Sequence, residues 1–438
     1  MKRGSIYKFS FILFFLLLTV GRIAISGKGY LEDTDEFYFL FMLDNWESLI
    51  KADTETWSNT IFHLWSHLPD NVIRFVQMIP MMWYAGEKGI PPQHPDALVI
   101  IGYFNILSSL LLLFIFYKLL RKLGFDQWLS LTGVVLFGTL VSSNIYTRHI
   151  LQYDHSLIWH LFALKLLIGH ETDRKRIMLV GLVAAIGVTS YPPHYMFVAI
   201  TGGWLFFRYY EGWIPSLKRM LYFLFPFILV VGGIELFCRI DRRSYFAFLG
   251  EYGGEGRNID TYEGFTMLFR YFYHVESFWG LLLLVLMVLG LYRAFFVKQD
   301  IKVKCLLGLA LGAYLTFSLL TWISSNMVLY GRGIYLYYPF VIISVLYFLS
   351  GLSRKSLSVF FTGAFVNYFF VINMLNQINY PRQWIYEYNL EETPDVRFQY
   401  KYKLDPRIEY SNAQQTRILG VESSSFTPGK YDLVNICF

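Results

Sequence analysis

The chain has 438 residues, of which 55% are hydrophobic, 19% are aromatic and only 16% are charged. Soluble domains are typically about 25% charged, so this composition excludes an ordinary soluble protein. The formal net charge of +6 predicts no nucleic-acid partner, because much of the Lys and Arg lies in short loops between apolar segments.

Apolar segments occur along most of the chain, and they approach the roughly 20 residues that a helix needs to cross a bilayer. We place about eleven of them, at residues 7–26, 97–117, 128–146, 154–169, 177–190, 194–209, 219–237, 276–294, 304–323, 333–350 and 357–375. The first is not followed by a small-residue cleavage site, so we interpret it as a retained helix. The sequence predicts an all-α, polytopic membrane protein with about eleven transmembrane helices.

Basic clusters precede the first predicted helix and then follow every second one. They are Lys2, Arg3 and Lys8; Lys118, Arg121 and Lys122; Arg174, Lys175 and Arg176; Lys218 and Arg219; Arg293, Lys298, Lys302 and Lys304; and Arg354 and Lys355. All of them fall on one side with this count, and basic loops are usually cytoplasmic. We expect a cytoplasmic N-terminus and an extracytoplasmic C-terminus. The absence of an Asn-x-Ser/Thr sequon favours a bacterial plasma membrane.

Three longer segments are expected outside the membrane, at residues 27–96, 239–275 and 376–438. In the first, apolar residues recur at helical spacing over 71–86, which predicts an amphipathic helix on the outer membrane surface. In the third, apolar and polar residues alternate over 396–404, which predicts a β-strand. We therefore divide the chain into a transmembrane domain, 1–375, and a small β-containing tail, 376–438.

Ionisable residues gather at the predicted outer ends of the helices. Charges in or beside the hydrocarbon layer are costly, so they are candidate functional groups. The candidates, in chain order, are Asp35, Glu36, Arg148, Asp154, His194, Arg242, Arg243, Arg257 and Arg332. We expect them to line one outward cavity together with aromatic side chains.

These residue types suit one kind of chemistry. A carboxylate can act as a general base toward a hydroxyl. Arginines bind phosphate oxygens in a bidentate fork. Aromatic faces pack against sugar rings or lipid chains. We infer a reaction in which a glycosyl group is transferred from a lipid phosphate. One general base and one cationic group that binds the phosphate suffice for it.

Three short motifs follow one another in the chain. They are "TDEFYF" with Asp35 and Glu36, "RHILQYDHSLIWHLFAL" with Arg148 and Asp154, and "YGRGIYLYYPF" with Arg332. Over roughly residues 7–350, their order and spacing resemble those of the C-type integral membrane glycosyltransferases, specifically the superfamily of protein O-mannosyltransferases and aminoarabinose transferases. Many relatives carry a lysine near "SYPPHYMF", where this chain has His194.

The resemblance implies inverting transfer of a sugar from a polyprenyl-phosphate donor to a hydroxyl of a glycan, lipid or protein acceptor. Asp35 would be the general base, and Glu36 would orient it or bind the acceptor. Asp154 would hold the acceptor or the sugar. The lipid phosphate would be neutralised by Arg332, with Arg148, and less directly by Arg242, Arg243 and Arg257.

Structural roles compete with these assignments. Asp35 and Glu36 could instead cap the first-loop helix, since carboxylates favour helix N-termini. Asp154 could in the same way be the N-cap of the fourth helix.

The sequence does not favour a metal site as the main interpretation of its histidines. His63 and His67 have the i, i+4 spacing of a helical metal pair but no third ligand nearby. A divalent metal site formed by Asp33, Asp35 or Glu36 stays an alternative, because some distant relatives of the family that this chain resembles use such a metal.

Three other functions compete with glycosyl transfer. One is a structural membrane subunit without chemistry, which would leave the one-sided cluster of ionisable residues unexplained. A transporter or flippase often contains paired repeats and helices broken at the membrane midplane, and the sequence indicates neither. A polymerase or ligase of lipid-linked glycans shares the substrate type, but a large acidic first loop with a surface helix is less expected there.

Overall fold

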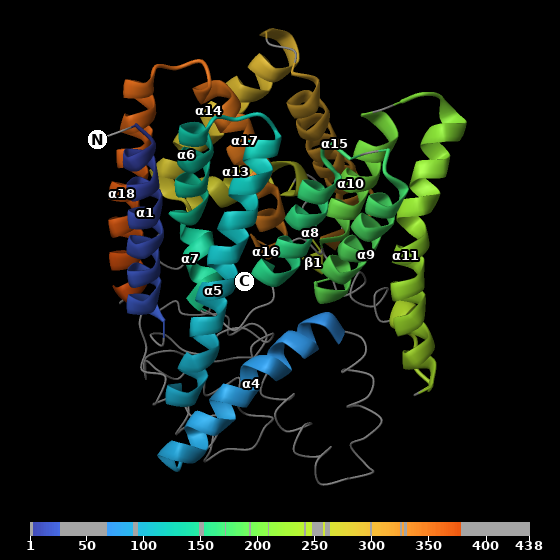
Figure 1. Cartoon of the computed structure of the whole chain (residues 1–438), viewed down its shortest axis with the longest axis horizontal. Helices are drawn as coiled ribbons and strands as arrows, with labels where there is room; N and C mark the ends of the chain where they lie inside the picture. Colours follow the sequence, from blue (N-terminus) through green and yellow to red (C-terminus); the bar gives the residue numbers. More distant parts are fainter. Residues whose placement is uncertain are drawn as a thin grey trace.

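The computed structural model describes residues 3–26, 68–90, 95–148, 153–170, 172–191, 194–208, 210–240, 242–247, 257–258, 263–297, 300–324, 326–327 and 331–377. These residues form a bundle of helices with one long helix lying obliquely across its lower end (Figure 1). The predicted strand at 396–404 and the histidine pair His63 and His67 lie outside the described residues and stay predictions.

In the first half of the chain, every secondary-structure element that the structure describes is a helix. Its helices are α1 (Arg3–Ile25), α4 (Leu68–Lys88), α5 (Pro95–Lys122), α6 (Gln127–Gly138), α7 (Val141–Arg148), α8 (Tyr153–Leu167), α9 (Arg174–Ser190), α10 (Tyr195–Phe207) and α11 (Trp213–Ile240).

The second half adds further helices and one short pair of strands. Its elements are β1 (Arg257–Asn258), α13 (Glu263–His274), α14 (Ser277–Tyr292), the π-helical turn η2 (Arg293–Val297), α15 (Ile301–Ser324), β2 (Asn326–Met327), α16 (Gly331–Ile334), the 3-10 turn η3 (Tyr335–Tyr337), α17 (Tyr338–Leu349) and α18 (Arg354–Gln377). The strands are antiparallel, with Arg257 opposite Met327.

Each predicted apolar segment falls on a helix or on a run of consecutive helices, so the all-α assignment holds for the described residues. Within them, five helices are long and apolar enough to cross a membrane, at Asp96–Lys122, Trp213–Ile240, Phe278–Val297, Ile301–Ile323 and Ser356–Leu375. Their outward side chains are apolar, as on α11, where Leu221, Phe225 and Ile228 are each more than half exposed. The larger number of crossings stays a prediction.

The segment 128–146 is not the single helix that we expected. It is divided into α6 and α7, and Thr139 is the C-cap of α6. The cause lies elsewhere in the chain, because the buried carboxylate of Glu276 accepts hydrogen bonds from the Val141 and Ser142 amides and so caps a new helix start.

Helix α4 confirms that the first loop contains a helix over the expected residues, and its place on the membrane surface stays a prediction. One face buries Met78, Met81 and Ala85 against α5. The opposite face exposes the apolar side chains Val72, Val76, Ile79, Met82 and Trp83. α4 contacts α5 and α9, and it lies toward the end of the bundle at which α1 and α11 end and α5 begins (Figure 1). We call this end of the bundle the α4 end.

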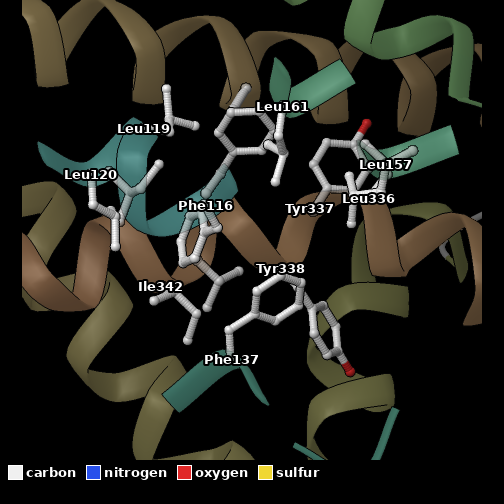
Figure 2. Packing of buried hydrophobic residues seen from close by; sticks show 14 of the residues in the cluster. Phe116, Leu119, Leu120, Phe137, Leu157, Leu161, Leu336, Tyr337, Tyr338 and Ile342 are labelled. Atoms are coloured by element: carbon white, nitrogen blue, oxygen red, sulfur yellow. The ribbon is translucent and has the colours of Figure 1, made fainter. Parts of the chain in front are cut away.

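The centre of the bundle is a dry core. Figure 2 shows side chains from several helices packed together there: Phe116, Leu119, Leu120, Phe137, Leu157, Leu161, Leu336, Tyr337, Tyr338 and Ile342. Rings of neighbouring elements meet edge to face, with the centroids of Phe116 and Phe137 5.3 Å apart. This packing fixes the backbone around residues 335–338, which carry polar groups of the candidate site.

Helices α14 and α17 approach closely at Gly290. A Cβ atom added there would collide with the Ser344 carbonyl oxygen, which is backbone and cannot rotate away. At Gly312 of α15, by contrast, an added Cβ would meet no atom within 4 Å.

The substitution Gly290→Ala is expected to lower the thermal unfolding midpoint in detergent, because overpacking a close helix contact costs about 1–3 kcal/mol. Gly312→Ala is the matched control, and it should leave the midpoint unchanged or raise it, since alanine is favoured over glycine in helices by about 1 kcal/mol. Equal shifts for both variants would contradict the close α14–α17 contact.

Candidate functional site

A buried arginine lies near the C-terminal end of α1. Arg22 is only 1% exposed. Its guanidinium donates to Ser109 Oγ at 2.6 Å and to Asn144 Oδ1 at 3.1 Å, and it reaches the carbonyl oxygens of Gly138 and Ser143 at 3.4 Å. α1, α5 and α7 are therefore joined through one cation inside the α4 end of the bundle.

A buried carboxylate faces the same interior. Asp154 is 5% exposed and lies in the first turn of α8, one residue after its start at Tyr153. Its Oδ1 accepts a 2.9 Å hydrogen bond from the Tyr335 hydroxyl. A negative charge in a first turn is favoured by the helix dipole, but here the bonded partner is a distant side chain. The segments that carry Asp154 and Arg332 in the sequence motifs thus meet in space.

The second oxygen of Asp154 is also buried. Oδ2 accepts no hydrogen bond of good geometry from the described residues, although Ser109 lies close by. The opposite charges of Arg22 and Asp154 attract each other across this interior. A carboxylate with one oxygen fixed and the other without a hydrogen bond keeps the capacity to accept one from a hydroxyl that reaches it.

Sequence reasoning missed a second buried carboxylate, Glu276. It is 2% exposed and is the N-cap residue of α14. It accepts hydrogen bonds from Val141 N at 2.6 Å, Ser142 N at 3.0 Å, Ser142 Oγ at 2.8 Å and Tyr338 OH at 3.0 Å. With its oxygens already satisfied, this group is built to hold α7 in place rather than to bind a substrate.

One short run of tyrosines reaches both carboxylates. Tyr335 contacts Asp154, and Tyr338, three residues later, contacts Glu276. The run follows Arg332 directly in the chain, since α16, η3 and α17 are consecutive. Only the tyrosine-rich "YLYY" could have indicated this in the sequence, because aromatic residues are too common here to stand out.

The structure places His194 deep inside the helix bundle. Its side chain has no exposed surface, and its Nδ1 lies 2.8 Å from Ser156 Oγ. Its ring lies 5.9 Å from that of His160, which stacks on Phe197. Its ring is thus packed among other side chains in the part of the chain that the structure describes, and its role at a phosphate stays a prediction.

The candidate arginines occupy several elements. Arg148 is the last residue of α7, and Arg332 is the second residue of α16. Arg257 lies in β1, whose pairing with β2 brings the second long loop beside the chain that leads to Arg332.

Arg242 and Arg243 follow α11 directly. Arg242 has a φ of 60°, the left-handed conformation that often ends a helix. The amides of both residues return to carbonyl oxygens of the last turn, at Arg239 and Cys238. The backbone of this pair therefore terminates α11, and the side chain of Arg242 is exposed.

The acidic pair Asp35 and Glu36, with Asp33, lies outside the described residues, so its position stays a prediction. The described chain enters this segment from α1, four residues after Arg22. Among the described residues, no group of three His, Cys, Asp or Glu side chains is placed to hold a metal ion.

Comparison with protein-family models, with curated proteins and with solved structures finds no match for this chain.

The electrostatic attraction between Arg22 and Asp154 can be tested by a double-mutant cycle. Arg22→Met is expected to destabilise the protein by about 1–3 kcal/mol, because it leaves the buried polar groups that Arg22 binds without their donor and removes the attraction on Asp154. Adding Asp154→Asn to Arg22→Met should recover part of that loss. Unfolding by denaturant in detergent measures both effects. Arg176→Met, which breaks a solvent-exposed pair with Asp173, should change stability by about 1 kcal/mol or less.

Strictly additive losses from Arg22→Met and Asp154→Asn would show that the two groups do not interact. That result would remove the electrostatic account of the α4 end.

Proposed function

We propose that this chain is an integral membrane glycosyltransferase that moves a sugar from a polyprenyl-phosphate donor to an acceptor hydroxyl, with inversion. The acceptor is a glycan, a lipid or a protein. The reaction takes place on the outer face of the plasma membrane, with the N-terminus cytoplasmic and the C-terminal tail outside. No resident cofactor is part of the proposal.

The observation that carries the proposal is the buried Asp154 carboxylate. One oxygen is fixed by Tyr335, and the other is buried and accepts no hydrogen bond of good geometry from the described residues. A buried acceptor without a partner is uncommon in folded proteins, because it costs free energy. An unsatisfied carboxylate oxygen at helix ends on one side of an apolar bundle is suited to bind a sugar or acceptor hydroxyl.

The proposed roles divide between the two acidic sites. Asp35 is the general base that removes the acceptor proton as the anomeric carbon leaves the lipid phosphate. Glu36 orients Asp35 or the acceptor, and Asp154 holds a hydroxyl of the sugar or acceptor. Arg332, with Arg148, compensates the charge of the departing phosphate. This interaction is strongest when one guanidinium donates hydrogen bonds to two phosphate oxygens.

A transporter or flippase of lipid-linked sugars is the second candidate. One observation bears on it, because α6 and α7 are separate helices where the sequence predicted a single one, and transporters often contain interrupted helices. Paired repeats, the other feature typical of transporters, are still not indicated by the sequence. Transport without bond cleavage would distinguish this candidate from the first.

Purified protein should release or transfer sugar from one member of a panel of polyprenyl-phosphate sugars. Asp35→Asn is expected to lower that rate by about 10²–10⁴-fold, the usual contribution of a general base. Asp154→Asn is expected to weaken sugar or acceptor binding and to raise KM. Glu87→Gln, which changes an exposed carboxylate of α4, is the matched control and should retain full activity.

Full activity in Asp35→Asn, with or without Glu36→Gln, would move the base to Asp33 or Asp154. Absence of both turnover and donor binding in the parent would reject the transferase. Movement of an intact donor across the bilayer would then support the second candidate.

A further inference from the structure

Helix α11 lies at the edge of the bundle, where it packs against α9 and α10 (Figure 1). Its contact with α9 is close, because a Cβ atom added at Gly181 of α9 would collide with the Phe223 carbonyl oxygen of α11. α11 ends at the α4 end, so its first turns lie at the opposite end of the bundle. We call Arg174 of α9, with Lys218 and Tyr222 of α11, the α9–α11 corner.

Two cationic side chains lie beside one aromatic ring at this corner. The guanidinium carbon of Arg174 lies 4.6 Å from the centroid of the Tyr222 ring. Lys218 precedes Tyr222 by four residues, so the two lie on the same face of α11. Helical side chains lean toward the N-terminus of their helix, so the Tyr222 ring leans over the turn that carries Lys218. Two exposed positive charges therefore lie close together.

The neighbouring carboxylates do not neutralise these two charges. Asp173 pairs with Arg176 at 3.6 Å, and Glu211 pairs with Arg219 at 3.3 Å. In the part of the chain that the structure describes, neither cation of the α9–α11 corner forms an ion pair. Like charges on neighbouring turns repel each other, so a bound anion would stabilise the corner.

The corner lies at the height where lipid headgroups would be. α11 has 28 residues, which span about 42 Å at about 1.5 Å per residue, so some of its turns extend beyond a hydrocarbon core of roughly 30 Å. Trp213, the first residue of α11, is 72% exposed, and its ring lies 5.9 Å from that of Tyr210. Exposed Trp and Tyr side chains are typical of the membrane–water interface, which places the first turns of α11 there.

An exposed apolar face of α11 begins beside Lys218. It contains Leu221, Phe225 and Leu229, each more than half exposed. Leu229 follows Lys218 by eleven residues, or about 16 Å along the helix axis, which is about half the thickness of the hydrocarbon core. A lipid tail that starts at the corner therefore meets an apolar surface through the depth of one leaflet.

The charges and the apolar face together select the ligand. Arginine and lysine bind phosphate oxygens, and a soluble phosphate would use these cations alone. A zwitterionic headgroup carries a cation of its own, which the corner would repel. We propose that the α9–α11 corner binds an anionic phospholipid, with its phosphate between Arg174 and Lys218 and one acyl chain along Leu221, Phe225 and Leu229.

The bound lipid would join the outermost helix to the rest of the bundle. Arg174 belongs to α9 and Lys218 to α11, so a single phosphate bridges two neighbouring helices. The corner lies at the opposite end of the bundle from the α4 end, and this lipid site does not depend on the reaction proposed above.

The test uses the full-length protein in phosphatidylcholine nanodiscs with a trace of phosphatidylglycerol that carries a diazirine on one acyl chain. Illumination should attach this lipid to the peptide that contains residues 221–229, in preference to phosphatidylcholine with the same diazirine chain. The double variant Arg174→Gln/Lys218→Gln should lower the yield by about 25-fold, which is about fivefold for each cation.

The double variant Lys88→Gln/Lys118→Gln is the matched control, because it removes the same two charges from exposed lysines of α4 and α5. Each of these lysines lies over one aromatic ring, Tyr84 or Phe114, as Arg174 lies over Tyr222. The control should leave the labelling yield nearly unchanged.

Three results would overturn the proposal. Equal labelling by phosphatidylglycerol and phosphatidylcholine in the parent would do so, and this comparison needs no substitution, so it decides the case even if a variant fails to fold. Equal losses in the two double variants would show that only net charge matters. Loss of labelling in excess glycerol phosphate would assign the corner to a soluble phosphate compound.

Discussion

The α4 end of this protein depends on the burial of opposite charges inside an otherwise apolar bundle. Arg22 is bound by side chains and carbonyl groups of three helices, and Asp154 is fixed by Tyr335. Removing two charges from water costs several kcal/mol for each ion, and the hydrogen bonds and mutual attraction must offset that cost. Stability alone does not account for this cost, because apolar side chains could pack there without a desolvation penalty. It is understandable if the carboxylate is needed for chemistry.

The same constraint organises the surrounding elements. The charged pair lies among α1, α5, α7 and α8, and the tyrosine run of α16, η3 and α17 closes it from another side. α7 exists as a separate helix because Glu276, from the turn between α13 and α14, caps its first amides. Segments more than a hundred residues apart are thus fixed by a few hydrogen bonds in a low-dielectric interior, where such bonds are strong and their loss is costly.

Much of the helical architecture could be predicted from the sequence, because runs of apolar residues report helices whatever their partners are. α4 was also predictable, since its apolar residues recur at helical spacing. The break between α6 and α7 was not, because it arises from the distant Glu276 carboxylate. Arg22 and Glu276 escaped notice for a related reason: a lone charge near the end of an apolar segment resembles one that snorkels toward water. Asp154 was found through its motif, whereas its bond with Tyr335 required the fold. Asp35 and Glu36 rest on the sequence alone.

The most direct test of the account is an experimental structure of the protein in a bilayer mimetic with a polyprenyl-phosphate sugar bound. The account predicts the sugar phosphate at the α4 end, with a hydroxyl of the sugar or of an acceptor at Asp154 Oδ2 and the segment that contains Asp35 folded over it. Donor bound at the opposite end of the bundle, or bound at the α4 end with Asp154 out of contact and Asp35 remote from the anomeric carbon, would contradict it.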